Sequence, residues 1–397
     1  MSSPAPQSHS IWITPAILFA TGWAANHFTA LMPVLARVED IPSTGLDAAF
    51  GIYALGLLPG LLVGGGLSDR YGRRTIVLTG LALATAGNLL MAGWAALLGV
   101  MLGRLVVGVG VALVMSVGTA WASDQDPAKG AARAGVALTS GFAAGPLFSG
   151  LLSQFIVGSP GLVLSFVVAV LLTAACGPFC LVTRSAVPVG VAGSAGPPSA
   201  AGDRHNDSPA QDGNLGRALA AALPMGLWVF TCIVIAMVVL AGRVDGHYSG
   251  PMLPAAAAVL SLGSGLVVQL ATRRISSWRP LGIIGALLAA AAFAISAVTD
   301  ASMSIEIFIL CSIVFGCAYG LCLNQGLRDL ETLAPRSSRG TATGIFYIVT
   351  YSGYGLPFIL NAFQDQIGTV TPMFALAALA VASAGARVVH LATPTRV

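Results

Sequence analysis

The chain has 397 residues, of which 56% are hydrophobic and only 9% are charged. Soluble domains carry about 25% charged residues, so this composition excludes a water-soluble fold and predicts an integral membrane protein. The formal net charge is +4, and its meaning depends on where the basic residues lie along the chain.

Twelve apolar segments are long enough to cross a bilayer, since a membrane helix needs about 20 mostly apolar residues. Alternating polar and apolar runs are absent, so helices are the only spanning structure available to this sequence. The first segment is too long for a signal peptide and is predicted to stay uncleaved. The predicted spans are 11–35, 46–67, 75–95, 97–121, 135–157, 161–183, 218–241, 251–272, 280–299, 303–324, 340–361 and 369–392.

The basic residues lie almost entirely on one side of these spans. Sixteen of the 19 fall in alternate loops or near the C-terminus, Arg104 lies within the fourth span, and Arg37 and Arg243 fall on the other side. Cytoplasmic loops are enriched in Lys and Arg, so we predict a multi-pass protein of the cytoplasmic or plasma membrane with both termini in the cytoplasm. The same distribution explains the positive charge without a nucleic-acid partner.

A segment rich in Gly, Pro, Ala and Ser separates the sixth span from the seventh. Residues 184–217 have little to bury and are predicted to form a cytoplasmic linker between two six-helix bundles, 1–183 and 218–397. Each half carries a related passage between its second and third spans: GGLSDRYGRRT from Gly65 and GLVVQLATRRI from Gly265. We therefore predict an all-α membrane fold of twelve helices in two bundles with pseudo-twofold symmetry.

The passage from Gly65 closely resembles the signature of the major facilitator superfamily between spans two and three. Patterns in the fourth and fifth spans are also similar to signatures of this family, and the fifth-span pattern resembles the one associated with drug:proton antiporters, although Ser149 replaces a glycine. The resemblance implies alternating access driven by a proton gradient, with export as the favoured direction. The residues that carry these patterns are Arg104 and Gly108 in the fourth span and Gly141, Gly145, Pro146 and Gly150 in the fifth.

The family precedent gives the loop between spans two and three a mechanical role. It implies that Asp69 meets the N-terminus of span eleven, near Gly340, where the partial positive charge of a helix stabilises a carboxylate by about 0.3–2 kcal/mol. This contact would latch the two bundles together on the cytoplasmic side. An ordinary positive-inside loop would explain the arginines but not Asp69 and its flanking glycines. The residues of the predicted latch are Gly65, Asp69, Arg70, Gly72, Arg73 and Arg74.

Arg104 is predicted to face the interior of its bundle, because a charge within the bilayer costs at least about 2.5 kcal/mol. Two interpretations stay open: it couples protons or attracts an anion, or its guanidinium satisfies backbone carbonyls of neighbouring spans. In the fifth span, Gly145 and Pro146 predict a break in the helix. That break would either close the central cavity against leakage or reflect close packing of small residues.

Few ionisable side chains remain for substrate or protons. His27 could carry a proton, although a lone buried histidine can also be a packing residue, and Glu306 could couple protons or simply reach water. With one cation and almost no carboxylate, the cavity suits a neutral, moderately apolar or anionic solute. The candidate cavity residues are Asn26, His27, Glu306 and Asn324.

We therefore predict a monomeric, proton-coupled exporter of a small organic compound, drug-like or a metabolite. The alternative is a proton symporter that imports a metabolite or organic acid. HExxH, GxSxG and P-loop patterns do not occur in the sequence, which argues against an enzyme or an ATP-driven pump. The six cysteines lie in apolar runs and are interpreted as packing residues, so neither a metal nor a cofactor is predicted.

Overall fold

The computed structural model describes residues 10–182, 214–244, 250–272, 275, 280–299, 302–335 and 338–392. This part of the chain is helical, apart from loops and one isolated bridge between Val244 and Met303. The helices of the first half are α1 (Ser10–Asn26), α2 (Phe28–Val38), α3 (Ser43–Tyr71), α4 (Arg73–Gly93), α5 (Leu97–Gln125), α6 (Gly130–Phe155) and α7 (Ser159–Val182). Those of the second half are α8 (Leu215–Val234), η1 (Ile235–Leu240), α9 (Met252–Thr272), α10 (Leu281–Val298), α11 (Ile305–Leu333), α12 (Arg339–Ser352), η3 (Gly353–Gly355), α13 (Leu356–Ala362), α14 (Gln364–Ile367) and α15 (Val370–Ala392).

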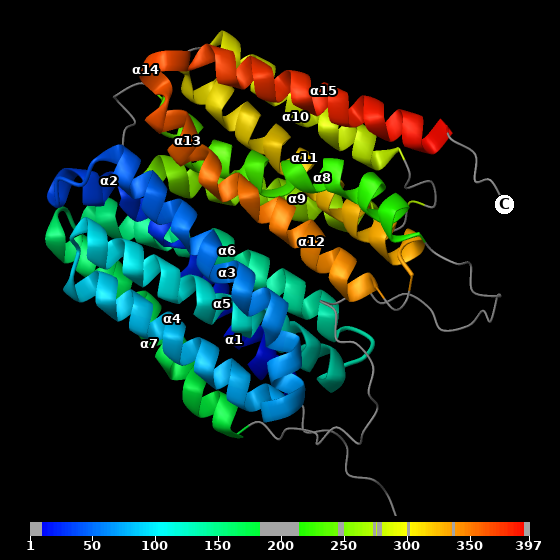
Figure 1. Cartoon of the computed structure of the whole chain (residues 1–397). Helices are drawn as coiled ribbons and strands as arrows, with labels where there is room; N and C mark the ends of the chain where they lie inside the picture. Colours follow the sequence, from blue (N-terminus) through cyan, green and yellow to red (C-terminus); the bar gives the residue numbers. More distant parts are fainter. Residues whose placement is uncertain are drawn as a thin grey trace, which may run out of the picture.

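Two bundles of helices lie side by side (Figure 1), one built from α1–α7 and the other from α8–α15. Eleven helical segments of the described chain are long and apolar enough to cross a membrane. The predicted first span is not among these eleven, because it is divided into two shorter helices, α1 and α2. Together with it, the described chain has twelve spans. The predicted all-α, twelve-span membrane fold is therefore confirmed.

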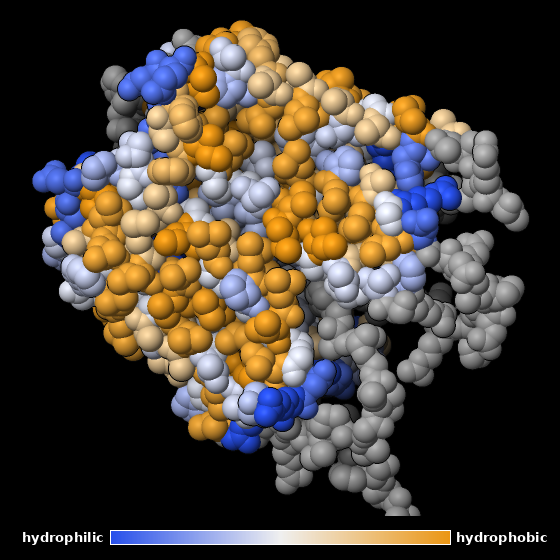
Figure 2. Space-filling view, in the orientation of Figure 1, coloured by the Kyte–Doolittle hydropathy of each residue, from blue (hydrophilic) through white to orange (hydrophobic). Residues whose placement is uncertain are grey.

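Side chains on the surface agree with this placement in a bilayer. Figure 2 shows hydrophobic residues over the middle of the visible face and hydrophilic residues toward its two ends. Large apolar side chains are exposed on peripheral helices, for example Leu171 on α7 at 62% and Val389 on α15 at 67%. Such exposure suits contact with lipid and would be unfavourable in water. The protein is thus an integral, multi-pass membrane protein.

The first span is interrupted at His27 for local reasons. The hydroxyl of Thr29 donates to the carbonyl oxygen of Asn26 at 2.9 Å, an acceptor that a regular helix offers to the amide of residue 30. In the next turn, Pro33 has no amide hydrogen to donate to the carbonyl of residue 29. These two features disturb consecutive turns of the helix.

The fifth span does not have the helix break that the sequence predicts at Gly145 and Pro146. Pro146 does not break the helix, since α6 runs without interruption from Gly130 to Phe155. Close packing by neighbouring helices allows a membrane helix to tolerate one missing amide hydrogen. The clearer irregularity is in span eleven, where the 3₁₀ turn η3 precedes Pro357. There a Cβ added at Gly353 would come 2.6 Å from the backbone nitrogen of Thr231 on α8.

The two bundles meet where α3 contacts α12, η3 and α13, and where α6 contacts α9. We call this surface the bundle interface. We call the end of the molecule that carries the loops 39–42 and 363–369 the arginine-poor end, and the opposite end the arginine-rich end. In Figure 1, α2, α13 and α14 mark the arginine-poor end, and the last turn of α15 lies at the arginine-rich end.

The predicted linker, 184–217, lies outside the described residues as far as residue 213. Asn214 then caps α8, its side chain accepting a hydrogen bond from the amide of Arg217 at 3.1 Å. In the second copy of the repeated passage, residues 273–274 also lie outside the described residues.

Candidate functional site

Arg104 lies near the start of α5, and its side chain is completely buried. Its Nη1 donates to the carbonyl oxygen of Ala25 at 2.7 Å. The guanidinium carbon lies 4.2 Å from the ring centre of Tyr53 and 4.6 Å from that of Phe28. Within the described chain, no carboxylate pairs with Arg104, and its Nε has no hydrogen-bond partner. The backbone carbonyl and the aromatic faces therefore stabilise the positive charge of the guanidinium, but they do not neutralise it.

Close backbone packing explains how the arginine reaches these rings. On the next turn of α5, Gly108 lies against the backbone of Tyr53 and the Cα of Gly56 on α3. A side chain at position 108 would push the two helices apart. The small residue thus holds α3 close enough for the ring of Tyr53 to cover the guanidinium.

A cluster of aromatic rings connects this arginine to the second bundle. Tyr354 of η3 stacks on Phe50 of α3, with ring centres 5.0 Å apart, and lies 5.7 Å from Tyr53. On the other side, Phe230 of α8 stacks on Tyr351 at 4.6 Å and meets Tyr354 edge-on at 5.5 Å. We call Phe50, Tyr53, Phe230, Tyr319, Tyr347, Tyr351 and Tyr354 the aromatic cluster.

This cluster was not predicted from the sequence, although the chain contains a signal for it. Tyr347, Tyr351 and Tyr354 follow one another at i, i+4 and i+7, which places them on one helix face. Five of the seven tyrosines of the chain belong to the cluster. An excess of amphipathic rings on one face of a membrane helix was therefore visible, but the spacing could not say which helix they meet.

The candidate residues of span one, Asn26 and His27, lie within the first bundle, between Ala25 and Phe28, which both contact Arg104. His27 is fully buried, with its Nε2 2.8 Å from Oδ1 of Asn88 on α4, and its ring lies edge-on to Phe166 of α7. The side-chain nitrogen of Asn26 donates to the carbonyl oxygen of Phe142 on α6 at 2.8 Å. This geometry favours the interpretation of both residues as packing residues that join helices within the first bundle.

The other two candidate cavity residues lie on α11, in the second bundle. Glu306 is exposed in the first turn of α11, where its carboxylate interacts favourably with the helix N-terminus. The side-chain nitrogen of Asn324 donates to the hydroxyl of Thr272 at 3.0 Å, which joins α11 to α9 within the second bundle. The structure therefore does not bring the four predicted cavity residues together.

The glycines of the fifth-span pattern contact two different partners. Gly141 lies against the backbone of Phe19 on α1, and a Cβ at Gly145 would come 2.8 Å from the carbonyl oxygen of Trp23. One turn beyond Pro146, a Cβ at Gly150 would come 2.9 Å from the carbonyl oxygen of Pro251, the residue that directly precedes α9. The pattern thus permits close packing of α6 both within its bundle and across the bundle interface.

The loop between spans two and three is a tight turn at the arginine-rich end. Gly72 has a φ of +84°, which favours glycine, and its amide donates to the carbonyl oxygen of Ser68 at 2.9 Å. Arg73 pairs with Asp124 at the end of α5 at 2.7 Å. Asp69 and Arg70 are exposed, and Asp69 has no hydrogen bond or ion pair with any described residue. In this conformation the predicted contact with α12 is not formed.

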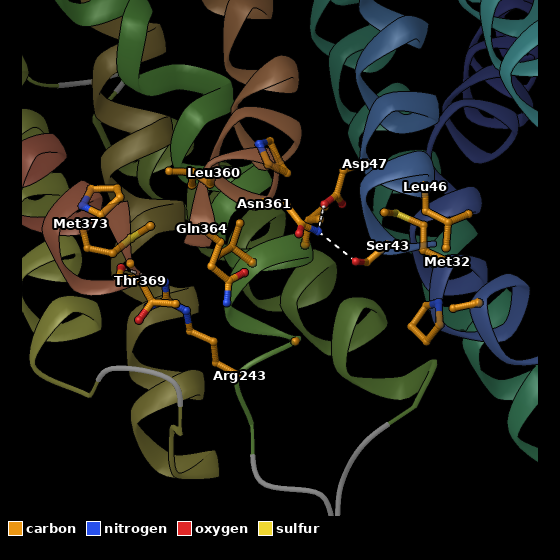
Figure 3. Close-up of a pocket in the computed structure, with 18 residues that line it drawn as sticks. Met32, Ser43, Leu46, Asp47, Arg243, Leu360, Asn361, Gln364, Thr369 and Met373 are labelled. Atoms are coloured by element: carbon orange, nitrogen blue, oxygen red, sulfur yellow. Dashed lines mark hydrogen bonds between the residues drawn. The ribbon is translucent and has the colours of Figure 1, made fainter. Parts of the chain in front are cut away.

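At the arginine-poor end, a polar contact that the sequence did not reveal joins the bundles. Asp47 of α3 is 7% exposed, and its Oδ2 accepts a hydrogen bond from Nδ2 of Asn361 on α13 at 2.8 Å. The same Nδ2 lies 3.1 Å from the hydroxyl of Ser43. Figure 3 shows this contact at one side of a cavity of about 390 Å³, which Arg243 and Thr369 line on the other.

A buried ion pair also escaped the sequence analysis. Arg387 of α15 binds Asp329 of α11 in a bidentate manner, with distances of 2.6 and 2.9 Å. Both side chains are almost completely buried, and Gln325 donates to the same carboxylate at 3.0 Å. Arg387, near the C-terminus, is one of the sixteen basic residues that the sequence assigns to the cytoplasmic side, and the structure buries it inside the second bundle. No group of three or more metal-binding side chains occurs in the described ranges.

Comparisons with known proteins address the fold. A family model described as the Major Facilitator Superfamily matches residues 16–358. A solved POT family transporter in complex with 5-aminolevulinic acid is 14% identical, with 96% of each chain covered and a TM-score of 0.76. The POT family transporter PepTSo is 13% identical, with 98% of each chain covered and a TM-score of 0.72.

A third solved structure is the human organic anion transporter MFSD10 (TETRAN). It is 16% identical over 96% of this chain and 100% of that one, with a TM-score of 0.67. No curated protein sequence matches this chain. At these identities the structural likeness concerns the fold alone.

Proposed function

Because the chain belongs to the major facilitator superfamily of membrane transporters, we propose that it is a monomeric, proton-coupled secondary transporter that exports a small organic compound by alternating access. The substrate is neutral or anionic and carries an apolar or ring-shaped body. The proposal involves neither catalytic residues nor a cofactor. The arginine-rich end faces the cytoplasm, as the distribution of basic residues favours.

The burial of Arg104 without a counter-ion is the observation that carries this proposal. An unneutralised charge inside a membrane protein is expensive and is characteristic of a transport pathway. Arg104 lies beside Tyr53, whose ring meets Tyr354 of the opposite bundle. A substrate that enters between the bundles could therefore neutralise the arginine and stack on the aromatic cluster.

Two neighbours in fold handle molecules that carry a carboxylate or other negative charge. One was solved with 5-aminolevulinic acid, and another is an organic anion transporter. A carboxylate would bind a guanidinium by charge-assisted hydrogen bonds. Export is favoured by the fifth-span pattern, which resembles that of drug:proton antiporters, and import of an organic acid by symport is the alternative that the experiment must separate.

The test uses everted membrane vesicles that contain the protein, energised by respiration and loaded with a quenched pH dye. The panel contains neutral aromatic compounds, aromatic carboxylates and polycations. We expect carboxylates or neutral compounds to release protons from the vesicle lumen, and polycations to have no effect. Vesicles without the protein are the control.

Three outcomes would contradict the proposal. If no compound releases protons while whole cells take one up in a proton-dependent way, the protein is an importer. If a polycation is the preferred substrate, the proposal that Arg104 binds a neutral or anionic substrate is wrong. An Arg104→Met variant that retains normal transport would remove the observation on which the proposal depends.

A further inference from the structure

Asp47 differs from the other buried carboxylate of the described chain in lacking a cation. Asp329 is neutralised by the bidentate contact with Arg387. Asp47 forms no ion pair within the described ranges, and its hydrogen-bonding partner is the neutral amide of Asn361. A carboxylate can accept about four hydrogen bonds, so a single amide compensates little of the cost of removing it from water.

Several charged groups lie on the elements around Asp47, but none binds it. Arg243 donates to the carbonyl oxygens of Ser296 and Thr369. Arg37, near the end of α2, donates to the carbonyl oxygen of Pro33. On α5, Arg104 lies farther along the interface beside Tyr53. Among the described residues, the other charged groups of this end are exposed carboxylates, namely Glu39, Asp40, Glu306 and Asp365.

The position of Asp47 makes its burial depend on conformation. Its partner Asn361 belongs to the opposite bundle, 314 residues away in sequence. The adjoining cavity of about 390 Å³ reaches the surface, since Gln364 and Gly368 line it and are exposed (Figure 3). When the bundles separate at this end, Asp47 loses Asn361 and becomes hydrated, so it is buried only while the arginine-poor end is closed.

From these contacts we infer that Asp47 is a proton-binding residue of the transport cycle, and that its protonation closes the arginine-poor end. The inference rests on the proposed proton-coupled function. Burying a neutral carboxylic acid costs much less than burying a carboxylate. Closure and proton binding therefore favour each other, as two linked equilibria must.

The side-chain amide of Asn361 can form a hydrogen bond with Asp47 in either protonation state of the carboxyl group. It donates to the carboxylate as the contact now stands, and by turning over it can present its carbonyl oxygen to a protonated Asp47. The neutral acid thus keeps a hydrogen bond in the closed state. In an exporter, a proton taken up at the outer face would then favour the return to the conformation that is open to the cytoplasm.

The experiment measures the distance between the bundles as a function of pH. Glu39→Cys and Gln366→Cys place spin labels on exposed positions of the two bundles at the arginine-poor end, in the full chain reconstituted in lipid nanodiscs. Lowering the pH should increase the short-distance population, by at most about tenfold per pH unit for a single proton. Protein without the two introduced cysteines controls for labelling of the native ones.

Two variants identify the titrating group. Asp47→Asn, a permanently uncharged mimic of the protonated acid, should hold the short distance at every pH. Asp365→Asn removes an exposed carboxylate at the same end and should respond to pH as the unmodified chain does. If Asp47→Asn does not fold, as judged by size-exclusion chromatography, Asp47→Ser provides the same test.

The outcomes separate this inference from the proposed function. A normal pH response in Asp47→Asn would overturn the role of Asp47 while leaving proton coupling intact. Opening of the arginine-poor end at low pH in the unmodified chain would do the same. An absent pH response in the unmodified chain would also overturn it if vesicles still release protons. If vesicles release no protons either, the proposed function fails as well.

Discussion

At the scale of single residues, the molecule treats its buried charges in three different ways. Arg387 and Asp329 neutralise each other, Asp47 is held by an amide of the opposite bundle, and Arg104 is surrounded by rings and one carbonyl. Removal of a charge from water is costly in each case. Only the first arrangement is neutral by itself, so the other two are the places where a proton or a substrate charge would matter.

Substitution of Arg104 by lysine should abolish most transport although the positive charge is kept. A lysine ammonium lacks the planar fork that lets the guanidinium donate to Ala25 while its face lies on Tyr53. We expect a rate at least about tenfold lower, equivalent to about 1.4 kcal/mol in the barrier, measured in the vesicle assay. Full activity of Arg104→Lys with an unchanged melting temperature would argue against a geometric role.

The Arg387–Asp329 pair should contribute to folding and not to transport. Arg387→Ala leaves a buried carboxylate without its partner, and such losses cost about 3–5 kcal/mol. Thermal unfolding in detergent should show a strong decrease in stability. The double variant Asp329→Leu, Arg387→Met should recover most of it, because no unpaired charge remains. A double variant as unstable as the single one would show that the pair is needed for more than neutrality.

At the scale of helices, glycines decide how closely the spans approach. Gly141 of α6 lies against the backbone of Phe19, while Gly135 of the same helix has no atom within 4 Å of its Cβ position. Small residues at helix contacts are the usual means of close packing in membranes, where no hydrophobic effect drives association. The sequence pattern showed the small residues but not that one face meets α1 and another meets α9.

A matched pair of glycine substitutions tests this packing. Gly141→Val should prevent the close contact of α6 with α1 and greatly reduce the yield of folded protein. Gly135→Val places the same β-branched residue on the same helix in open space and should be tolerated. Fluorescence-detected size-exclusion chromatography of both variants measures the yield, and equal yields would show that the α1–α6 contact tolerates side chains.

At the scale of the whole molecule, the two ends of the bundle interface differ. At the arginine-poor end, Asn361 bonds to Asp47, and Tyr354 stacks on Phe50 across the interface. At the arginine-rich end, Asp69 is exposed and unpaired within the described chain. In the proposed alternating-access cycle, the contacts at the two ends form in different conformations, and in this structure the contacts of the arginine-poor end are formed.

In this scheme the latch of Asp69 forms in the opposite conformation. Asp69→Asn should leave folding unchanged and weaken that conformation by about 2- to 30-fold, the effect of about 0.3–2 kcal/mol at a helix N-terminus. Transport should fall accordingly in the vesicle assay. Glu331→Gln, a charge loss at the same end, is the control, and a normal rate in Asp69→Asn would refute the latch.

The sequence by itself determined the features that depend only on the match of each segment to the bilayer and on the backbone geometry of each turn. Apolar length gave the spans, arginine counts predict an orientation, and Gly72 provides the turn between spans two and three. These features need no knowledge of distant contacts, because each span must suit the bilayer and each turn must suit its own backbone. The break predicted at Pro146 was wrong, since α6 continues through this residue; packing by neighbouring helices overrides the local effect of proline.

Only the tertiary structure decided which polar and aromatic groups meet. Asp47 and Asn361 are 314 residues apart, and Asp329 and Arg387 are 58 residues apart. The periodicity of a helix shows which residues share a face but not which helix covers that face. Arg104 was therefore recognisable in the sequence as a charge in an apolar span. Asp47 could be identified as a candidate proton-binding residue only from the fold, which buries it between the two bundles.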